Sequence, residues 1–510
     1  MRRKCRSVTG LIGLLLTGVA HAQSLPAFPG AEGFGAVASG GRGGTVLYVT
    51  TLAPDPNGVE PGSLNWALRQ PGPRYILFKV SGVIHAPARV VTGNVTIAGQ
   101  TSPGGVVVRG LVCDGHYDRN DCSNLIVRHL RSRPAGHRGI PAGGDALDDA
   151  LRLDGLRRFI IDSSSFAHAE DEAVQLSWAS QGTIQHSIIA ETVGDHAEYG
   201  GMLMNYSHPD FPQDQLSLHH NLWYRIAGRL PEFTCEGSNY EGLPATNSDC
   251  LAHPLRLEIS HNLYFDPGFL IYYNRDIDLN PAAGPYRLQL NMIGNRMIVR
   301  SGHGYPLFLR DILDVAQNEV FVADNRMSNY PLFADYQLAF CCNNFPENAP
   351  NTDFGVATRR SERHAFPPIS ATPSDALPAL IQSRVGAAPR DPMDRRMLAR
   401  VAGGVPQALD YRVPEQEDAF ALDFDPANPP ASPQDSDSDG MPDAFEREHA
   451  ARGLDPMVAD HNGTQLSLPL TGMAGYTNLE VYLNLLADQL SGTPAPRIFG
   501  DGFEPVPSNR

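Results

Sequence analysis

The sequence predicts an all-β fold of the solenoid type, and three observations support this prediction. From Tyr75 to about Met327 the chain is a run of short apolar segments separated by Gly, Asn, Asp and Ser, which is typical of strands joined by turns. Helical periodicity is rare over the same range. A pattern of an apolar residue, two polar residues, Asn or Ser and a large residue recurs there, twice at a spacing of 23 residues, which is about one coil of a β-solenoid.

The polar position of this repeat keeps a constant place relative to the strands. Stacked Asn or Ser side chains can form a hydrogen-bonded ladder between coils and so satisfy turn backbone that would otherwise be buried without partners. The alternative is that Asn is simply common in turns, but the constant phase favours the ladder. The expected members are Ser164, Ser187, Asn221, Asn262, Asn295 and Asn318.

The first 22 residues have the three parts of a secretion signal. Four basic residues within the first six are followed by the apolar run Leu11 to Val19 and by a small-residue cleavage site, Ala20-His21-Ala22. We therefore expect a mature chain that begins at Gln23 and is secreted. The apolar run is shorter than the roughly 20 residues that span a bilayer, and no later stretch approaches that length, so no membrane protein is expected.

Charge and lysine content restrict the partners. The formal net charge is −16 for the whole chain and about −20 without the four basic signal residues, which argues against nucleic acid as a partner. An acidic polysaccharide remains compatible if a bound cation bridges the two anions. Only Lys79 remains in the mature chain, so any fixed positive charge in a site must come from arginine.

The cysteines of the mature chain form an even set, which suits an oxidising compartment. Their spacing suggests Cys113 with Cys122 and Cys235 with Cys250, each pair closing a loop. A bond between the neighbours Cys341 and Cys342 would be strained, so these two stay unassigned.

The amino-terminal part begins with a glycine-rich segment, residues 28–50, that runs into the alternating strand Val46 to Val49. A phosphate cradle would follow a strand and open a helix, so tight turns at the start of a β domain are the better interpretation. A short helix capped by Ser63 precedes the strand Tyr75 to Phe78. A lone helix before many strands predicts a cap on the solenoid.

The carboxyl-terminal part loses the strand pattern. Residues 374–401 read as helical with a proline-containing break, and they are expected to cover the last open coil. Residues 406–433 are rich in Pro and acidic residues and predict a linker between the β domain, residues 23–405, and a small module, residues 434–490. Residues 491–510 remain as a tail.

The stretch from Asp149 to Pro231 organises the chain. Each of its short strands is next to polar turn residues, so carboxylates and one arginine fall at the edges of strands. A metal-assisted site would be built there.

Several motifs of the chain occur together in a family-specific order: Phe28 to Gly35, Ile97 to Thr101, Ile161-Asp162, His219-His220-Asn221 and Arg229-Leu230-Pro231. Together they resemble the pectate lyases of polysaccharide lyase family 1, over about residues 26–405. The resemblance implies a right-handed parallel β-helix and calcium as cofactor. It also implies a secreted lyase that cleaves α-1,4-polygalacturonate, an acidic plant cell-wall polysaccharide, by β-elimination.

The resemblance also assigns roles. Asp149 and Asp171 match calcium-binding acids of the family, and Gln175 stands where many members have another carboxylate. Arg229 matches the family's base, whereas our own reasoning from the residues allows an electrostatic clamp instead, because a free guanidinium stays protonated. Secondary candidates for substrate binding, each with a structural role as the alternative, are His196, His220 and Arg225.

Two departures from the family pattern stand near the expected base. Glu232-Phe233-Thr234 occupies the place of a second arginine, and no lysine lies in the region to match the family's assisting lysine.

Near the carboxyl terminus, the segment 435–446 has calcium ligands at positions 1, 3, 5, 9 and 12 of a loop and Gly at position 6. It resembles the thrombospondin type 3 and EF-hand-like modules of secreted bacterial enzymes, against the alternative of a solvated acidic linker. A capping box at Thr477 predicts a partner helix, and Asp460 with Asn462 could add a second, weaker ion site. The expected ligands of the loop are Asp435, Asp437, Asp439, Met441, Asp443 and Glu446.

The sequence predicts a monomeric pectate lyase, and two other functions are compatible with it. A β-helix hydrolase or esterase would use a close pair of acids, for which Asp148 with Asp149 or Glu170 with Asp171 can be proposed. Neighbours on a strand point to opposite faces, which disfavours both pairs. The other alternative is a non-catalytic, calcium-dependent polysaccharide-binding protein. It is favoured if the two departures from the family pattern near Arg229 have removed the activity.

Overall fold

The computed structural model of the 510-residue chain describes residues 25–115, 120–134, 148–193, 200–208, 210–233, 235, 250–268, 272–273, 286–303, 307–340, 349–352, 354–404, 406, 410–411 and 413–492. The expected signal peptide, His196, Cys341, Cys342 and nearly all of the expected tail lie outside the described residues.

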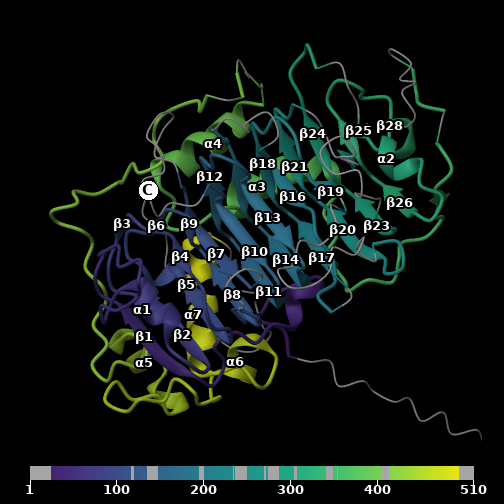
Figure 1. Cartoon of the computed structure of the whole chain (residues 1–510). Coiled ribbons are helices and arrows are strands. Elements are labelled where there is room, and N and C mark those ends of the chain that lie inside the picture. Colours follow the sequence, from purple (N-terminus) through teal and green to yellow (C-terminus); the bar gives the residue numbers. More distant parts are fainter. Residues whose placement is uncertain are drawn as a thin grey trace, which may run out of the picture.

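Three parallel sheets run along the molecule and form a right-handed parallel β-helix, as expected (Figure 1). The sheets are called A, B and C, and their strands are given in the next paragraph; each coil contributes strands in the order C, A, B. Each strand pairs in parallel with the strand one coil further on, as Leu151 of one coil does with Val174 of the next. Because every coil needs its neighbours to satisfy its backbone, the stack extends well beyond the size of an ordinary domain.

The bounds of the strands are as follows. Sheet A contains β1 (Thr45–Val49), β2 (Arg74–Phe78), β5 (Val95–Ala98), β8 (Leu125–Arg128), β11 (Arg157–Asp162), β14 (Ser180–Gln185), β17 (Asp214–His219), β20 (Leu255–Ser260), β23 (Leu288–Ile293), β26 (Glu319–Ala323) and β29 (Thr358–Arg359). Sheet B contains β3 (Gly82–Ile84), β6 (Val106–Val108), β9 (Arg131–Ser132), β12 (Ser165–Ala167), β15 (Ile188–Ala190), β18 (Leu222–Tyr224), β21 (Leu263–Phe265), β24 (Arg296–Ile298) and β27 (Arg326–Met327). Sheet C contains β4 (Ala88–Arg89), β7 (Leu111–Asp114), β10 (Leu151–Asp154), β13 (Val174–Ser177), β16 (Met202–Met204), β19 (Glu232–Phe233) and β22 (Tyr272–Tyr273). A small separate pair is β25 (Leu307–Phe308) with β28 (Ala339–Phe340).

The helices are short and lie outside the coils. They are α1 (Leu64–Arg69), α2 (Arg310–Leu313), α3 (Leu377–Arg384), α4 (Pro392–Gly403), α5 (Asp443–Glu448), α6 (Ser467–Thr471) and α7 (Asn478–Leu490). Single 3-10 turns occur at η1 (Phe34–Val37), η2 (Gly99–Thr101), η3 (Asp335–Gln337), η4 (Ser374–Ala376) and η5 (Ala450–Arg452). Within the described ranges, no helix has the length and apolar character needed to cross a membrane.

The core of the β-helix is built by strand alternation. In β10, Leu151 and Leu153 are fully buried in the central apolar cluster, while Arg152 between them is partly exposed. The same alternation in successive coils stacks Leu, Ile, Val and Phe side chains inside the coils, and their burial supplies the main favourable term in folding. Helix α1 adds Leu64 and Leu68 to this cluster, and its Ser63 accepts a hydrogen bond from the Trp66 amide, as the sequence predicted.

The ladder predicted between coils is present at the corner between sheets A and B. The Ser187 amide donates to Asn221 Oδ1 at 2.9 Å, and the Asn221 amide donates to Asn262 Oδ1 at 3.1 Å. Asn318 was assigned wrongly, because the ladder continues from Asn295 to Asn325, whose Oδ1 accepts from the Asn295 amide at 3.2 Å. Asn318 precedes its strand at another corner, so a matching interval in the sequence did not mean a matching position in the coil.

Helices α3 and α4 do not cover the last coil, so that part of the prediction was wrong. They lie along the outer face of sheet B, where Ile381, Met393 and Met397 pack against residues of several strands, including Ile188 and Leu222. The outward side chains of the middle strands β12, β15, β18 and β21 are largely apolar, and α3 and α4 bury them, which is a favourable contribution to folding.

Two buried arginines fix α4 to the sheet. Arg133 Nη1 lies 2.6 Å from Asp391 Oδ2, and Arg133 Nη2 lies 2.9 Å from Asp394 Oδ1. Arg131 of β9 lies 3.2 Å from the same Asp391 carboxylate. Burial raises the pKa of Asp391, but Arg133 and Arg131 outweigh it and bring that pKa to about 2.

The segment expected to be a linker lies against the β-helix. Tyr224 donates to Glu415 at 2.5 Å, and Arg396 of α4 lies 2.7 Å from Asp418. The helices that follow the segment pack on the first strands of sheet A, at the bottom of Figure 1.

Removal of one ladder side chain should lower stability measurably. In Asn262→Ala the Asn221 amide and the Leu218 carbonyl lose their buried partners, and we expect a loss of about 2 kcal/mol in the free energy of unfolding. Calorimetry and urea unfolding measure the loss. The exposed Asn57→Ala is the control and should stay within about 0.5 kcal/mol of the wild type.

Removal of the Asp391 charge should be much more costly. Asp391→Asn leaves Arg131 and Arg133 buried beside a weaker acceptor, so we expect a loss of about 3 to 5 kcal/mol. Because the folded pKa of Asp391 is depressed, its contribution is present at neutral pH and is lost as pH falls from about 4 towards 2. Asp375→Asn, which breaks an exposed pair with Arg296, should change stability little. Equal losses in the two variants would contradict the buried-pair argument.

Candidate functional site

The candidate site lies at the edge of sheet C where its strands begin. Asp149 and Glu172 occupy the same place in consecutive coils, each two residues before its strand, β10 or β13. Gly200 holds this place in the next coil, before β16, and as a glycine it places no side chain of its own beside Glu172. Arg229, before β19, reaches across the gap and forms an ion pair with Glu172. Three coils thus bring acids and an arginine together.

Three carboxylates converge here. Asp149, Asp171 and Glu172 each offer an oxygen, and these oxygens lie within 4.8 Å of one another. The Glu172 amide donates to Asp149 Oδ1 at 3.0 Å, and only 3% of the Asp149 surface is exposed. Burial raises the pKa of Asp149 well above its usual range, Arg152 opposes this, and Asp171 adds to it. A bound cation would relieve this repulsion, and carboxylate oxygens are the donors that calcium prefers.

Glu172 was missed in the sequence, although a signal for it existed. It lies 23 residues after Asp149, the same interval as one coil of the repeat. The rule that neighbouring residues point to opposite faces did not apply, because Asp171 and Glu172 precede β13 and are not part of the strand. Both carboxylates can therefore turn towards Asp149.

Gln175 was predicted as a further ligand. It lies within β13, and its Nε2 donates to Ser177 Oγ at 3.2 Å. Its role as a ligand stays a prediction.

Arg229 is held by two carboxylates. Besides Glu172 it contacts Glu232, with Nε 2.9 Å from Oε2, and its side chain remains partly exposed. The sequence presented Glu232 only as a departure from the family pattern. The structure gives it a positioning role, because pairing on two sides restricts the orientation of the planar guanidinium.

Arg152 is a second arginine that the sequence analysis did not identify. It points outward from β10, with Nε 2.8 Å from Asp154 Oδ2 and Nη1 3.7 Å from Asp149 Oδ2, and 28% of its side chain is exposed. Burial raises the pKa of Asp154 to about 6, against the opposing effect of Arg152. The alternation of Leu151 and Leu153 with Arg152 was the signal that this side chain faces out of the sheet.

His220, predicted as a substrate contact, lies at the corner between β17 and β18. Its ring stacks between those of His186 and His261, with centroids 5.2 and 5.0 Å away, and its Nε2 lies 3.0 Å from Thr372 Oγ1. The acidic group lies at the edge of sheet C, so the structure does not bring His220 to it. Burial lowers the pKa of His220 and keeps its ring neutral.

Arg225, the other described candidate for substrate binding, follows β18. Its Nη1 lies 2.9 Å from Glu191, a carboxylate that also binds Arg396 of α4 at 2.8 Å. This pairing gives Arg225 a part in attaching α4 to sheet B. Its contact with substrate stays a prediction.

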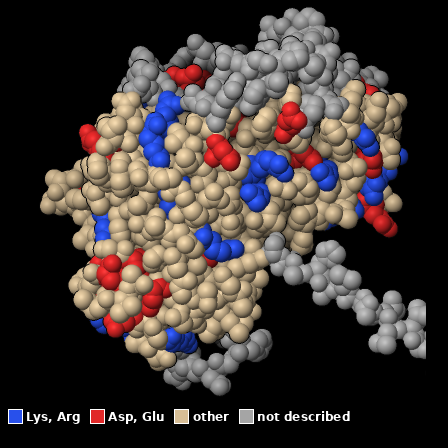
Figure 2. Space-filling view, turned by 60° about the horizontal axis from the view of Figure 1, so that its bottom comes forward, with Lys and Arg blue, Asp and Glu red and all other residues tan. Residues whose placement is uncertain are grey.

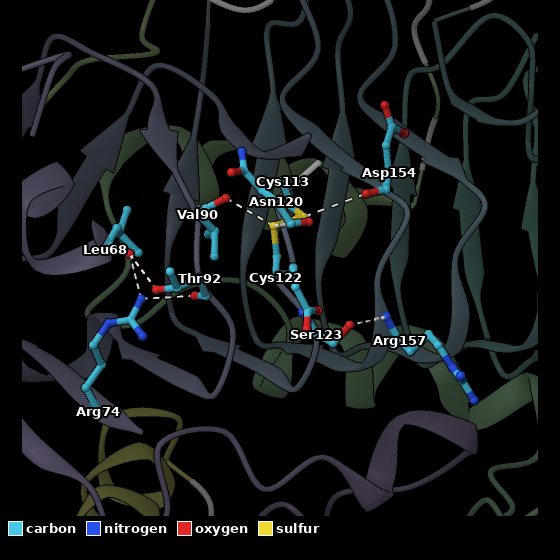
Figure 3. The surroundings of a disulfide bond; sticks show 11 residues. Leu68, Arg74, Val90, Thr92, Cys113, Asn120, Cys122, Ser123, Asp154 and Arg157 are labelled. Atoms are coloured by element: carbon cyan, nitrogen blue, oxygen red, sulfur yellow. Dashed lines mark hydrogen bonds between the residues drawn. A yellow bond between two sulfur atoms is a disulfide. The ribbon is translucent and has the colours of Figure 1, made fainter. Parts of the chain in front are cut away.

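Both disulfides suggested by the spacing are present. Cys113 of β7 joins Cys122 with 6.1 Å between their Cα atoms, and Cys235 after β19 joins Cys250 with 6.4 Å. Figure 3 shows the first disulfide beside Asp154 of the next coil. Because Asp114 of β7 pairs in register with Asp154, this disulfide holds the layer next to the candidate site.

The carboxyl-terminal loop contains a second acidic site. Oxygens of Asp435, Asp437 and Asp439 lie within 4.8 Å of one another, and Asp439, Glu446 and Asp460 form an overlapping group. Burial and Asp439 raise the pKa of Glu446 to about 8. On the face turned forward in Figure 2, Asp and Glu side chains gather at the lower left with few basic side chains among them.

Three residues of this module, Asp443, Met441 and Asp460, make contacts that were not expected, and the ligand roles of Asp443 and Met441 stay predictions. Asp443 accepts hydrogen bonds from the Ser436 amide at 2.8 Å and from Arg447 at 2.9 Å, so the structure uses it to hold the loop. The Met441 side chain is buried in the apolar cluster beneath, and a ligand role for its carbonyl stays a prediction. Asp460 joins Asp439 and Glu446 at the site of the loop, and it does not form a separate site with Asn462. The side-chain amide of Asn462 donates to the Gly44 carbonyl instead.

A stack of parallel coils with acids and an arginine at the edge of one sheet defines an enzyme of the parallel β-helix class. No family model matches the chain. A curated protein of Aspergillus flavus, "Probable pectate lyase C", is 30% identical over 474 residues, which cover 91% of this chain and 94% of that protein. Its namesake in Aspergillus fumigatus is 29% identical over 482 residues, or 93% and 97% of the two chains. The chain belongs to the pectate lyase family.

Solved structures with a similar fold have lower identity. A pectate lyase of Paenibacillus sp. 0602 shares 12% of residues with a TM-score of 0.42, covering 73% of this chain and 99% of that one. The cedar pollen allergen jun a 1 shares 16% with a TM-score of 0.39, covering 70% and 93%.

Neutralising Glu172 should weaken cation binding at the edge of sheet C. Glu172→Gln removes one charged oxygen and one partner of Arg229, so we expect the calcium affinity of this site to fall at least about tenfold. Calorimetric titration measures the affinity. Glu170→Gln, two residues away and not among these three acids, is the matched control, and equal affinities in both variants would remove Glu172 from the ligand set.

Proposed function

We propose that this enzyme is a secreted, calcium-dependent pectate lyase that cleaves α-1,4-polygalacturonate by β-elimination. The observation that supports it best is the convergence of Asp149, Asp171 and Glu172 with Arg229 at one edge of sheet C. The amino-terminal signal, residues 1–22, and two disulfides suit an oxidising compartment and support secretion.

Asp149, Asp171 and Glu172 would hold the ion. All their donors are hard carboxylate oxygens, and the buried Asp149 is repelled by Asp171 although Arg152 opposes this effect, so the donor set fits calcium. Bound calcium supplies Lewis-acid stabilisation of the negative charge that develops at the substrate carboxylate. Such an ion also explains how a chain of strongly negative charge can accept an acidic polymer.

Arg229 would act at the reacting sugar. In β-elimination the proton on C5 leaves, the C4–O bond to the neighbouring sugar breaks, and a double bond forms between C4 and C5, while the departing oxygen stays on that sugar and takes a proton from water. Arg229 either takes that proton or stabilises the negative charge beside it. When Glu172 serves as a cation ligand, it would share its negative charge between the cation and the Arg229 guanidinium. Glu232 keeps the side chain oriented meanwhile.

Arg152 would bind a carboxylate of the polymer. It faces outward next to the acidic group, and it is paired on one side with Asp154, so it is held in place but still accessible. In a chain with almost no lysine, such an arginine is the available fixed positive charge for an anionic sugar.

The loop at residues 435–446 would bind a second calcium ion. Its aspartates and Glu446 converge as an EF-hand-like loop requires, and this site lies outside the catalytic edge of sheet C.

A hydrolase remains the second candidate, because close carboxylates and the raised pKa of Asp149 are also what acid catalysis uses. The two reactions differ in product. Elimination leaves an unsaturated sugar that absorbs ultraviolet light, whereas hydrolysis leaves a reducing end without that absorbance.

Replacement of Arg229 should abolish turnover without unfolding the chain. We expect Arg229→Ala to lose at least about a thousandfold in kcat on polygalacturonate, because an interaction made in the transition state is removed. The assay follows the ultraviolet absorbance of the product with calcium or with chelator. Arg296→Ala, which removes an arginine from an exposed ion pair, is the control and should keep full activity. Unchanged turnover in Arg229→Ala would exclude Arg229 from the mechanism, and reducing ends without absorbance would support the hydrolase.

A further inference from the structure

The carboxyl-terminal module covers the first coils of the β-helix. Tyr75 and Leu77 of β2 and Ala98 of β5 are buried in one apolar cluster with Leu479 and Val481 of α7. These side chains face outward from sheet A, so without the module they would be exposed to water. The module therefore completes the outer face of the amino-terminal coils.

Polar contacts join the same two parts. Arg42 Nε lies 2.8 Å from Glu480, the Tyr75 hydroxyl lies 3.1 Å from Thr477 Oγ1, and Arg128 Nη1 donates to Asn484 at 3.2 Å. Most of these groups are buried, so their pairing depends on the module being in place.

The acidic loop itself touches the β-helix. The Tyr48 hydroxyl of β1 donates to Asp435, and Lys79 stacks over the Tyr48 ring at 3.8 Å. A Cβ atom at Gly440, whose φ is +102°, would lie 2.9 Å from the Leu77 side chain, so the loop backbone is pressed against β2. Movement of the loop would therefore disturb its contacts with β1 and β2, the first two strands of sheet A.

One observation within the loop points to a ligand. Glu446 is fully buried, both of its carboxylate oxygens are without a hydrogen-bond partner, and one of them lies within 4.8 Å of Asp439 and Asp460. Burial of a charged group with no partner costs several kcal/mol unless a cation pairs with it. The unpaired Oδ2 of Asp437 lies in the same loop.

Asp460 connects the site to α7. It comes from outside the 435–446 loop, its amide donates to Asp439 Oδ2 at 2.9 Å, and its carbonyl accepts from Asn478 at 3.0 Å. Asn478 is the first residue of α7, the helix that packs on sheet A. A cation bound by Asp439, Glu446 and Asp460 would thus hold the loop and the helix together.

We propose that a calcium ion held by Asp435, Asp437, Asp439, Glu446 and Asp460 clamps the carboxyl-terminal module onto the first coils of the β-helix. Without the ion, five carboxylates repel one another, the loop opens, and the outward side chains of β2 and β5 lose their cover. Five carboxylates suit calcium, which takes six to eight oxygen ligands. The inference rests on the proposed calcium loop and is independent of the catalytic edge of sheet C.

The test uses the full chain with calcium or with chelator. Hydrogen exchange reports on β1 and β2, calorimetry gives the Tm, and calorimetric titration counts the bound ions. For the wild type we expect calcium to raise the Tm by at least about 5 °C and to slow exchange in β1 and β2 at least about tenfold.

Variants separate the clamp from the catalytic site. Asp460→Asn should bind one calcium ion fewer or more weakly and lose most of the protection of β1 and β2, while it keeps the turnover of the wild type at saturating calcium. Glu448→Gln, which neutralises an exposed acid on α5, should behave as the wild type. Asp171→Asn should change the calcium requirement of turnover and leave the protection of β1 and β2 intact.

Tyr48→Phe tests the clamp with all five carboxylates left in place. It removes the hydroxyl bonded to Asp435 and keeps the ring, so calcium should still bind but protect β1 less. Calcium could bind the loop while the amides of β1 and β2 exchange equally fast with and without calcium. That result would overturn the clamp and leave the calcium-binding loop supported. If Asp460→Asn binds calcium as the wild type does, Asp460 is no ligand. If Asp439→Asn binds as many calcium ions as the wild type, the loop is not a calcium site. Lyase activity that persists in this variant would still support the proposed function.

Discussion

Parallel pairing in strict register is the constraint on which the rest of this structure depends. Because Leu151 pairs with Val174 and the pattern repeats coil after coil, any position in one coil lies directly beside its counterpart in the next. The Asn ladder, the histidine stack and the acidic group all follow from this. Asp149 and Glu172 meet only because they hold the same position before consecutive strands.

The same register creates outer faces that need cover. Sheet B carries an apolar outer surface that α3 and α4 cover, and the first strands of sheet A carry one that α7 covers. Buried ion pairs such as Arg133 with Asp391 and Arg42 with Glu480 attach these helices. The helical segments outside the coils therefore pack against the β-helix, which the acidic, Pro-rich composition of residues 406–433 did not indicate.

Within the described part of the chain, groups of carboxylates converge at the edge of sheet C and in the carboxyl-terminal loop, and both groups must overcome mutual repulsion. At the edge of sheet C the repulsion among Asp149, Asp171 and Glu172 is offset by Arg229, whose side chain stays partly exposed. In the carboxyl-terminal loop, neither carboxylate oxygen of Glu446 has a hydrogen-bond partner among the described residues, so a bound cation is the compensation that we propose there. We therefore expect the first site to serve chemistry and the second to serve assembly.

The sequence by itself determined the β-helix, both disulfides, the caps at Ser63 and Thr477, and the acids and arginine at the strand edges, because these depend on local pattern and spacing. Tertiary structure alone decided that Asn325 and not Asn318 continues the ladder, that Glu172 and Asp460 join the acidic groups, and that Asp443 bonds to Ser436 and Arg447. It also decided that α3, α4 and α7 cover sheets. The reason is physical: loops of unequal length separate the coils, so the position of a residue within its coil, and hence its neighbours, cannot be counted along the chain.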